Sequence, residues 1–230
     1  MKFLIDDADI NRIKKLYEFY PIDGVTTNPS ILAKCGRPPY EALRDIRAFI
    51  GNKAELHVQV VSTTADDMVE EGRKIERTLG NNTFIKIPTT PEGLKAMQIL
   101  KGEGYRITAT AIYTPMQAYL AAKAGAEYAA PYVNRIDNLG ADGVTTTKKI
   151  QDIYVRNNLS TKILAAGFKN SQQVQELCEY GVSCMTIASD VIENLIKNAN
   201  VTMAVDDFVA DFESLCGKGK TMLNCEESEK

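Results

Sequence analysis

The 230-residue sequence contains no tryptophan and a single histidine, His57. One imidazole cannot build the multi-histidine sites that hold most catalytic zinc or non-haem iron, so we expect no metal and no cofactor. The five cysteines are scattered, odd in number and without a CxxC pair. This pattern is typical of reduced thiols rather than of a disulfide framework, and it predicts a cytoplasmic protein.

The sequence also lacks long apolar runs and a strong charge of either sign. No run of 18 apolar residues occurs, so we predict no membrane span. Residues 1–9 become acidic too early for a secretory signal. The formal net charge of −3 gives no reason to expect a nucleic-acid or anionic-membrane partner.

What is present is an alternation of short β-branched runs with longer amphipathic runs. The strand-like runs are 2–6, 24–28, 55–61, 82–88, 106–113, 126–133, 161–168 and 183–190. Each is followed by apolar residues at three- and four-residue spacing, which predicts a helix. Eight such units predict an α/β fold of the (β/α)8 TIM-barrel type. An open doubly wound sheet more typically has five or six strands and a glycine-rich first turn, and no GxGxxG follows any strand here.

No low-complexity linker divides the chain, and we therefore predict one domain over residues 1–217. An amphipathic segment at about 201–215 follows the eighth unit and predicts an additional C-terminal helix. This segment has more apolar residues than a surface helix needs. Residues 218–230 form a polar tail.

One lysine stands inside the apolar run TFIKIP at residues 83–88. Lys86 has Ile85 and Ile87 as neighbours, and lysine is almost never fully buried without a reason. Residues two apart in a strand share a face. The late positions of such faces in other predicted strands are Asp6, Thr26, Asn28, His57, Gln59, Thr108, Thr110 and Tyr132. Since barrel enzymes keep their chemistry at these strand ends, we expect the polar groups to converge on one cavity.

Each of these residues also has an ordinary interpretation. A lone strand lysine more often extends its amine to water, and a single histidine is more often a hydrogen-bonded core residue. Asn28 before Pro29 suits a turn, and Asp6 suits a helix cap. The functional interpretation depends on their joint placement.

A buried amine supports one kind of chemistry in particular. Burial disfavours the ammonium form, so the pKa of such a lysine falls and more of it is a nucleophilic free amine. It can attack a ketone and form a Schiff base, whose electron withdrawal allows a carbon–carbon bond to break. Tyr132 is a candidate acid/base for the leaving hydroxyl, with Gln59 positioning a bound water.

Six segments carry a resemblance to a known family. They are GVTTNPSIL (24–32), HVQVV (57–61), FIKIP (84–88), TATAIY (108–113), AGAEYAAPYVNRID (124–137) and LAAGFKN (164–170). The chain resembles the transaldolase family, most of all its small branch, the fructose-6-phosphate aldolases. The similarity runs from residue 2 to the last predicted helix.

The resemblance implies a role for each matching residue. Lys86 forms the Schiff base, Asp6 assists proton transfer and holds a donor hydroxyl, and Thr110 positions the water with Gln59. The resemblance places Thr26, Asn28, Arg135 and Gly167 in the substrate site, with Arg135 on the acceptor phosphate. We predict Ala130, Lys169 and Ser189 as further substrate-binding residues. The position of Gln59 is glutamate in true transaldolases, and that of Tyr132 is phenylalanine in many of them. Both positions match the aldolase branch.

One motif departs from the family pattern. The family usually has ASF after its seventh strand, with serine touching the phosphate, whereas this sequence has Ala166, Gly167 and Phe168. Gly167 has no hydroxyl, although its N–H can still meet an anion. A charge-assisted hydrogen bond contributes about 1.5–3 kcal/mol. Its loss would weaken a preference for phosphate, which Arg135, Lys169 and Ser189 can still bind.

The resemblance and the residues together predict a metal-independent Schiff-base aldolase. Its substrate is fructose 6-phosphate or a related ketose, cleaved at C3–C4 to dihydroxyacetone and glyceraldehyde 3-phosphate. One alternative is a transaldolase, which transfers the dihydroxyacetone unit between sugar phosphates. A second is a catalytically silent barrel with a binding or assembly role. The resemblance also implies a homo-oligomer, a pentamer or decamer, in which the C-terminal helix packs on a neighbouring subunit.

Overall fold

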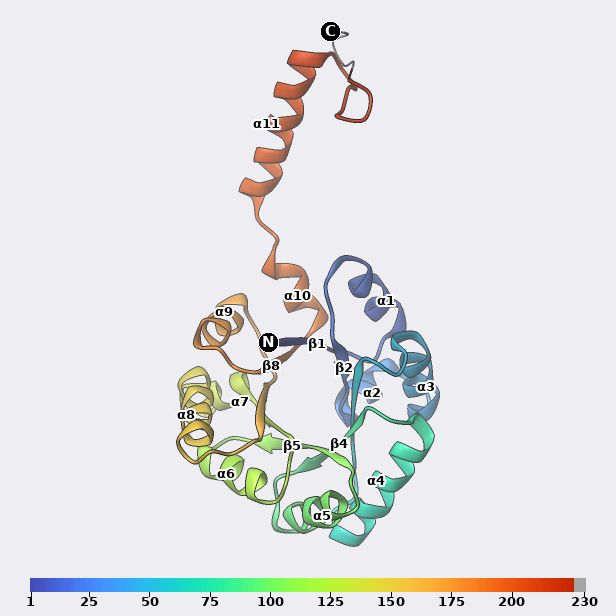
Figure 1. The fold of residues 1–230 in the computed structure, drawn as a ribbon, viewed down its shortest axis with the longest axis vertical. Coiled ribbons are helices and arrows are strands. Elements are labelled where there is room, and N and C mark those ends of the chain that lie inside the picture. The colour runs from blue at the N-terminus through green and yellow to red at the C-terminus, as the bar shows by residue number, and fades with distance from the viewer. Residues whose placement is uncertain (226–230) are drawn as a thin grey trace. The chain divides into compact units, whose positions relative to one another are not determined.

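A computed structural model of the chain describes residues 1–225 and contains a closed barrel of eight parallel strands. The strands are β1 (Lys2–Asp6), β2 (Gly24–Thr26), β3 (Glu55–Gln59), β4 (Thr83–Pro88), β5 (Arg106–Ile112), β6 (Tyr128–Pro131), β7 (Lys162–Ala165) and β8 (Cys184–Ile187). They pair in chain order, and β1 also pairs with β8, which closes the ring (Figure 1). The predicted (β/α)8 fold is confirmed.

Helices follow the strands, and those within residues 1–192 surround the barrel (Figure 1). They are α1 (Ile10–Phe19), α2 (Pro29–Cys35), α3 (Pro39–Ile50), α4 (Ala65–Leu79), α5 (Pro91–Gly102), α6 (Pro115–Lys123), α7 (Val133–Asp137), α8 (Gly143–Arg156), α9 (Ser171–Tyr180), α10 (Ser189–Leu195) and α11 (Ala199–Cys216). Thr64, Thr90 and Thr114 begin α4, α5 and α6 by accepting a bond from a first-turn N–H. These caps fix where each strand-to-helix connection ends.

The core lies inside the barrel and between the strands and their helices. Leu4, Phe84, Tyr128 and Leu164 are fully buried and form one cluster within the ring of strands. Residues of the opposite faces, such as Ile85 and Ile107, are also fully buried, because the helices cover the outside of the barrel. Parallel strands buried on both faces account for the nearly continuous apolar runs in the sequence.

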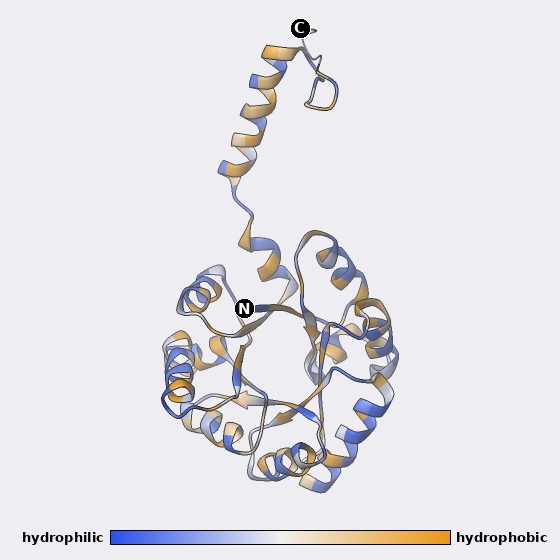
Figure 2. Cartoon of the chain, viewed as in Figure 1, coloured by the Kyte–Doolittle hydropathy of each residue, from blue (hydrophilic) through white to orange (hydrophobic). Residues whose placement is uncertain are grey.

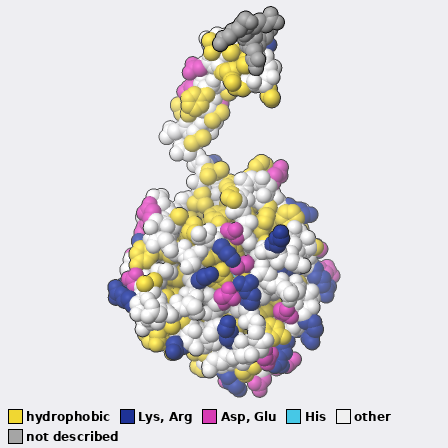
Figure 3. Space-filling model, in the orientation of Figure 1, with side chains coloured by type: hydrophobic (Ala, Val, Ile, Leu, Met, Phe, Trp, Pro, Cys, Tyr) yellow, Lys and Arg dark blue, Asp and Glu magenta, His cyan; other side chains and the backbone are white. Residues whose placement is uncertain are grey.

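The chain forms two compact units, Met1–Ile192 and Glu193–Lys230. The second unit contains α11, which confirms the predicted C-terminal helix. No residue of α11 is buried. Hydrophobic residues recur along this helix (Figure 2), and hydrophobic side chains lie on its surface (Figure 3). The single domain over 1–217 stays a prediction. Residues 226–230 of the expected polar tail lie outside the described residues.

Within residues 1–225, no helix combines the length and the apolar character that crossing a membrane requires.

Candidate active site

Lys86 lies in the middle of β4 with only 4% of its side chain exposed. Its Nζ donates a hydrogen bond to the backbone carbonyl of Thr27 at 2.8 Å. Burial lowers the pKa of Lys86, while the nearby charge of Asp6 acts to raise it. The alternation of β4 therefore buries the amine as the sequence pattern predicted, and the burial favours its uncharged form.

Asp6 ends β1 and accepts a hydrogen bond from Thr26 Oγ1 at 2.7 Å. Thr26 Oγ1 also lies 2.6 Å from Thr186 Oγ1 on β8. Since Thr26 gives its one proton to Asp6, Thr186 is the donor in this second bond. Burial raises the pKa of Asp6, although Lys86 and the bond from Thr26 act to lower it. The Asp6–Lys86 pair is thus shifted toward its neutral forms, a free amine and a carboxylic acid.

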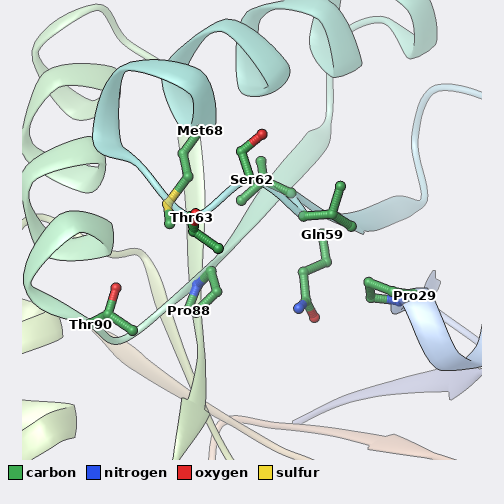
Figure 4. A pocket seen from close by; sticks show the side chains of 9 residues that line it. Pro29, Gln59, Ser62, Thr63, Met68, Pro88 and Thr90 are labelled. Atoms are coloured by element: carbon green, nitrogen blue, oxygen red, sulfur yellow. The ribbon is translucent and has the colours of Figure 1, made fainter.

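Gln59 ends β3 and is the Cα partner of Lys86 in the β3–β4 pairing. Its Oε1 is buried and accepts no hydrogen bond from any described residue. A cavity of about 380 Å³ adjoins it, lined by Pro29, Gln59, Val60, Val61, Ser62, Thr63, Met68, Pro88 and Thr90. Figure 4 shows the amide end of Gln59 turned away from Ser62. A buried acceptor without a partner is suited to holding a water or a substrate hydroxyl.

Tyr132 and Thr110 form a second polar pair, with Tyr132 Oη 2.9 Å from Thr110 Oγ1. Tyr132 comes just after β6 at the start of α7. The guanidinium of Arg135 lies over the Tyr132 ring at 4.6 Å, and Arg135 Nη1 donates to Tyr113 Oη at 3.4 Å. The charge of Arg135 acts to lower the pKa of Asp6, but burial outweighs it and the pKa of Asp6 is raised.

Two other predicted residues have clear structural roles. Asn28 Oδ1 accepts a bond from the N–H of Ile31 at 3.0 Å and caps α2, so its structural role is a helix cap and not a turn. Ala130 on β6 is 2% exposed and packs in the core cluster with Leu4 and Phe84. Their substrate contacts stay predictions.

Three of the predicted phosphate-binding residues, unlike Arg135, have no hydrogen bond or ion pair to this cluster within residues 1–225. Ser189 is 2% exposed and donates to Asp7 Oδ2 at 2.5 Å. Lys169 has an exposed side chain, and its backbone N–H donates to Gln173. Gly167 has φ +73°. Contact of all three with a phosphate stays a prediction.

Three participants were missed by the sequence analysis. The carbonyl of Thr27 holds Lys86, and a backbone group leaves no mark in a sequence. Thr186 reaches Thr26 from β8, where a polar residue in the apolar run CMTI was an available signal. Tyr113 contacts both Arg135 and Tyr132, with the two tyrosine rings 5.7 Å apart.

His57 lies on β3 and is the Cα partner of Phe84, two residues before Lys86 on β4. His57 is fully buried, its ring stacks on Phe84 at 4.4 Å, and its Nδ1 lies 2.9 Å from Thr108 Oγ1. His57 is therefore a hydrogen-bonded core residue, which is the ordinary interpretation of a single histidine. Within residues 1–225 no group of three or more His, Cys, Asp or Glu side chains is arranged to hold a metal ion.

Comparison with known proteins gives a consistent result. A family model described as transaldolase/fructose-6-phosphate aldolase matches residues 3–224. A probable fructose-6-phosphate aldolase of Streptococcus pneumoniae is 42% identical over 213 residues, 92% of this chain and 96% of that protein. Probable transaldolases of Hydrogenobaculum sp. and Aquifex aeolicus are 38% and 37% identical, over 95% and 94% of this chain and 99% and 98% of theirs.

A solved structure is similar in fold alone. It is a racemase from Streptomyces coelicolor with bound magnesium, with a TM-score of 0.55 and 16% sequence identity. The match covers 82% of this chain and 52% of that one, so the likeness supports the barrel and carries no argument about activity.

Proposed function

Because this chain belongs to the transaldolase/fructose-6-phosphate aldolase family, we propose that it is a Schiff-base aldolase that needs no metal. The family and its named relatives establish an aldolase or transaldolase enzyme. The observation that carries the finer proposal is the amine of Lys86, buried in the barrel and with its pKa lowered. The proposed substrate is fructose 6-phosphate or a related ketose, cleaved at C3–C4.

The first step is attack of Lys86 Nζ on the C2 carbonyl of the ketose. A neutral amine that donates one N–H to the Thr27 carbonyl keeps its lone pair for this attack. The carbonyl oxygen leaves as water, with Asp6 as the proton donor, since burial raises the pKa of its carboxyl. The product is a protonated imine at C2, which withdraws electrons from the C3–C4 bond.

The second step is removal of the proton from the C4 hydroxyl. Tyr132 is the proposed acid/base, oriented by Thr110 at 2.9 Å. A water held by Gln59 Oε1 connects the tyrosine to the substrate. As the C3–C4 bond breaks, the aldehyde leaves and an enamine remains on Lys86. Protonation at C3 and hydrolysis of the imine release dihydroxyacetone and regenerate the amine.

The first test is chemical trapping of Lys86. Borohydride reduction with dihydroxyacetone present should fix a secondary amine on the peptide that contains Lys86, measured by mass spectrometry. Lys86→Met should give no adduct and lower the cleavage rate by about 10⁴-fold or more, because the nucleophile is lost. Lys169→Met, which removes an amine elsewhere, should leave the adduct in place. An unmodified Lys86 peptide, with a known Schiff-base aldolase trapped in parallel, contradicts the proposal.

The second test separates aldolase from transaldolase activity. Release of glyceraldehyde 3-phosphate from fructose 6-phosphate is compared without acceptor and with erythrose 4-phosphate. We expect cleavage without acceptor to predominate, because Gln59 and Tyr132 match the aldolase branch and support attack by water. The double variant Gln59→Glu with Tyr132→Phe should shift the ratio toward transfer. Tyr180→Phe, which removes an exposed phenol of α9 outside the site, is the matched control. An unchanged ratio in the double variant contradicts these roles.

Two further proposals concern the setting of the enzyme. We propose a cytoplasmic location, supported by five cysteines that are all free thiols. We also propose a homo-oligomer, a pentamer or decamer, in which α11 packs on a neighbouring subunit. Support comes from α11 itself, where Phe208 is 69% exposed and Leu215 is 82% exposed.

A further inference from the structure

Strand β5 has one extra residue relative to strand β6, with which it pairs. Ala109 pairs with Ala129 and Ile112 pairs with Pro131, so three steps on β5 match two steps on β6. Such an extra residue is a β-bulge, which is rare between parallel strands and is often found beside active sites. The bulge contains Thr110 and Ala111.

Ala111 has a left-handed backbone, with φ +56°. Only two other non-glycine residues among the described ones have a positive φ, and both are asparagines, Asn82 and Asn158. Asparagine tolerates this conformation because its side chain bonds locally, whereas alanine has no such compensation. Ala111 is therefore strained, and such strain persists only where the surrounding structure enforces it.

Hydrogen bonds fix the chain on both sides of Ala111. Before it, the carbonyl of Thr110 accepts two bonds from Thr89, from the N–H at 2.9 Å and from Oγ1 at 3.0 Å. Thr89 lies three residues after Lys86, directly beyond the end of β4. After it, the carbonyl of Ile112 accepts the N–H of Tyr132 at 3.1 Å. The bulge thus connects the strand of Lys86 to the backbone of Tyr132.

The side chains follow from this backbone. Thr110 is fully buried, and its Oγ1 lies 2.9 Å from Tyr132 Oη. The extra residue shifts the register of β5 against β6 between Ala109 and Ile112. Without it, the side chains that follow the bulge would point to the opposite face of the sheet, because side chains alternate along a strand. The turn of the chain at Ala111 allows Thr110 to meet Tyr132 while Ile112 remains fully buried.

We propose that Ala111, through its left-handed conformation in the β5 bulge, is a positioning residue that sets the Thr110–Tyr132 pair for proton transfer. Ala111 itself need not touch the substrate. The inference rests on the proposed function, since it assigns Tyr132 a proton-transfer role. It concerns only the step after Schiff-base formation, so Lys86 chemistry is independent of it.

The test compares substitutions that oppose or permit a positive φ. Ala111→Val has a β-branched side chain that resists this conformation, and we expect kcat for cleavage to fall by about 10–100-fold with little change in KM. Borohydride trapping of dihydroxyacetone on Lys86 should stay at the wild-type level. Ala111→Gly, the conservative variant, adopts the left-handed conformation without strain and should keep most of the wild-type kcat. Asn158→Val opposes a positive φ at a position outside the site, so it is the matched control and should leave kcat unchanged.

A double-mutant cycle makes the positioning role explicit. Thr110→Val removes the hydroxyl that the bulge is proposed to place, and Ala111→Val combined with it should be no worse than the more impaired single variant. Multiplied losses, or a wild-type kcat in Ala111→Val, overturn the inference. Thr89→Val, which removes one bond to the Thr110 carbonyl, tests the same link if Ala111→Val does not fold. It should lower kcat severalfold with trapping intact, and an unchanged kcat overturns the inference. Absence of the adduct in the wild type would instead overturn the proposed function.

Discussion

At the scale of single residues, the conformation of Gly167 bears on how a phosphate is bound. Its φ of +73° lies in the left-handed region, where glycine is free of strain and serine is not. A Cβ added there would meet only the Tyr132 Cα at 3.9 Å, so space is not the obstacle. Glycine suits this backbone conformation, but it lacks the side-chain hydroxyl of the serine that is usual at this position in the family pattern. The contacts proposed for the acceptor phosphate therefore include the backbone N–H of Gly167 in place of a hydroxyl, together with the side chain of Arg135.

The buried His57 makes a prediction about stability and pH. Burial lowers the pKa of His57 to about 4, although Glu55 acts to raise it. Burial alone would raise the pKa of Glu55, but bonds from His57 and Lys2 lower it to about 2. Glu55 therefore stays ionised as an acceptor, so His57 Nε2 carries the proton toward it at 3.4 Å. His57 Nδ1 then accepts from Thr108, and protonating the ring would force the Thr108 hydroxyl to turn and accept instead.

The sign of the effect follows from proton linkage. The unfolded chain binds a proton at His57 below about pH 6.5, whereas the folded chain resists protonation until about pH 4. The free energy of unfolding should therefore fall by up to about 3 kcal/mol as the pH drops through this window. The lowered pKa of Glu55 reduces the free energy of unfolding further only below about pH 4.5, where the unfolded chain begins to protonate this carboxylate. Urea unfolding measured at about pH 7 and about pH 4.5 tests this.

His57→Gln is the matched control for this prediction, because it lacks a group that titrates. Asp6 has a raised pKa and contributes with the opposite sign, but it is common to both proteins and cancels in their difference. The variant should be less stable at neutral pH and should lose less stability on acidification. Equal losses in the wild type and the variant would show that His57 is not the group that responds.

At the scale of elements, the sequence predicted the strands well and the short helices poorly. All eight strand-like runs contain an observed strand, because β-branched runs bounded by glycine and polar residues leave little choice. The observed strands are mostly shorter; for example, β6 covers Tyr128–Pro131 within the predicted 126–133. The sequence predicted one helix after each strand. Helices α2 and α7, with seven and five residues, precede the longer helices α3 and α8 and were not predicted, since so few residues show no clear helical period.

The candidate site was predictable as a set of side chains but not as a set of contacts. Lys86, Asp6 and Thr26 stand out as polar groups in apolar strands, and the alternation of strands brings them together. The bond from Lys86 to the Thr27 carbonyl and the bulge at Ala111 involve backbone geometry. No spacing rule in the sequence signals either one. They arise from tertiary pairing between neighbouring strands.

At the scale of the whole molecule, α11 is the element whose composition does not fit its environment. Large apolar side chains that are more than half exposed occur at Val201, Met203, Val205, Phe208, Val209 and Leu215. No residue of this 18-residue helix is buried. Fully burying one such side chain is worth roughly 1.5–3 kcal/mol, so several together are a strong driving force for association. In the proposed oligomer, a second copy of the chain covers the apolar side chains of α11.

The last prediction is therefore about assembly. Light scattering should give the full-length protein a mass five or ten times the 25.4 kDa of one chain. Phe208→Glu places a charge in the proposed contact and should shift the protein to smaller species, because an unpaired buried charge is costly. Asp207→Lys, which also changes the charge of α11, is the matched control and should assemble. Trapping on Lys86 in the Phe208→Glu variant reports whether the barrel is intact. A monomeric wild type, or a variant that assembles as the wild type does, contradicts the packing of α11 on a neighbour.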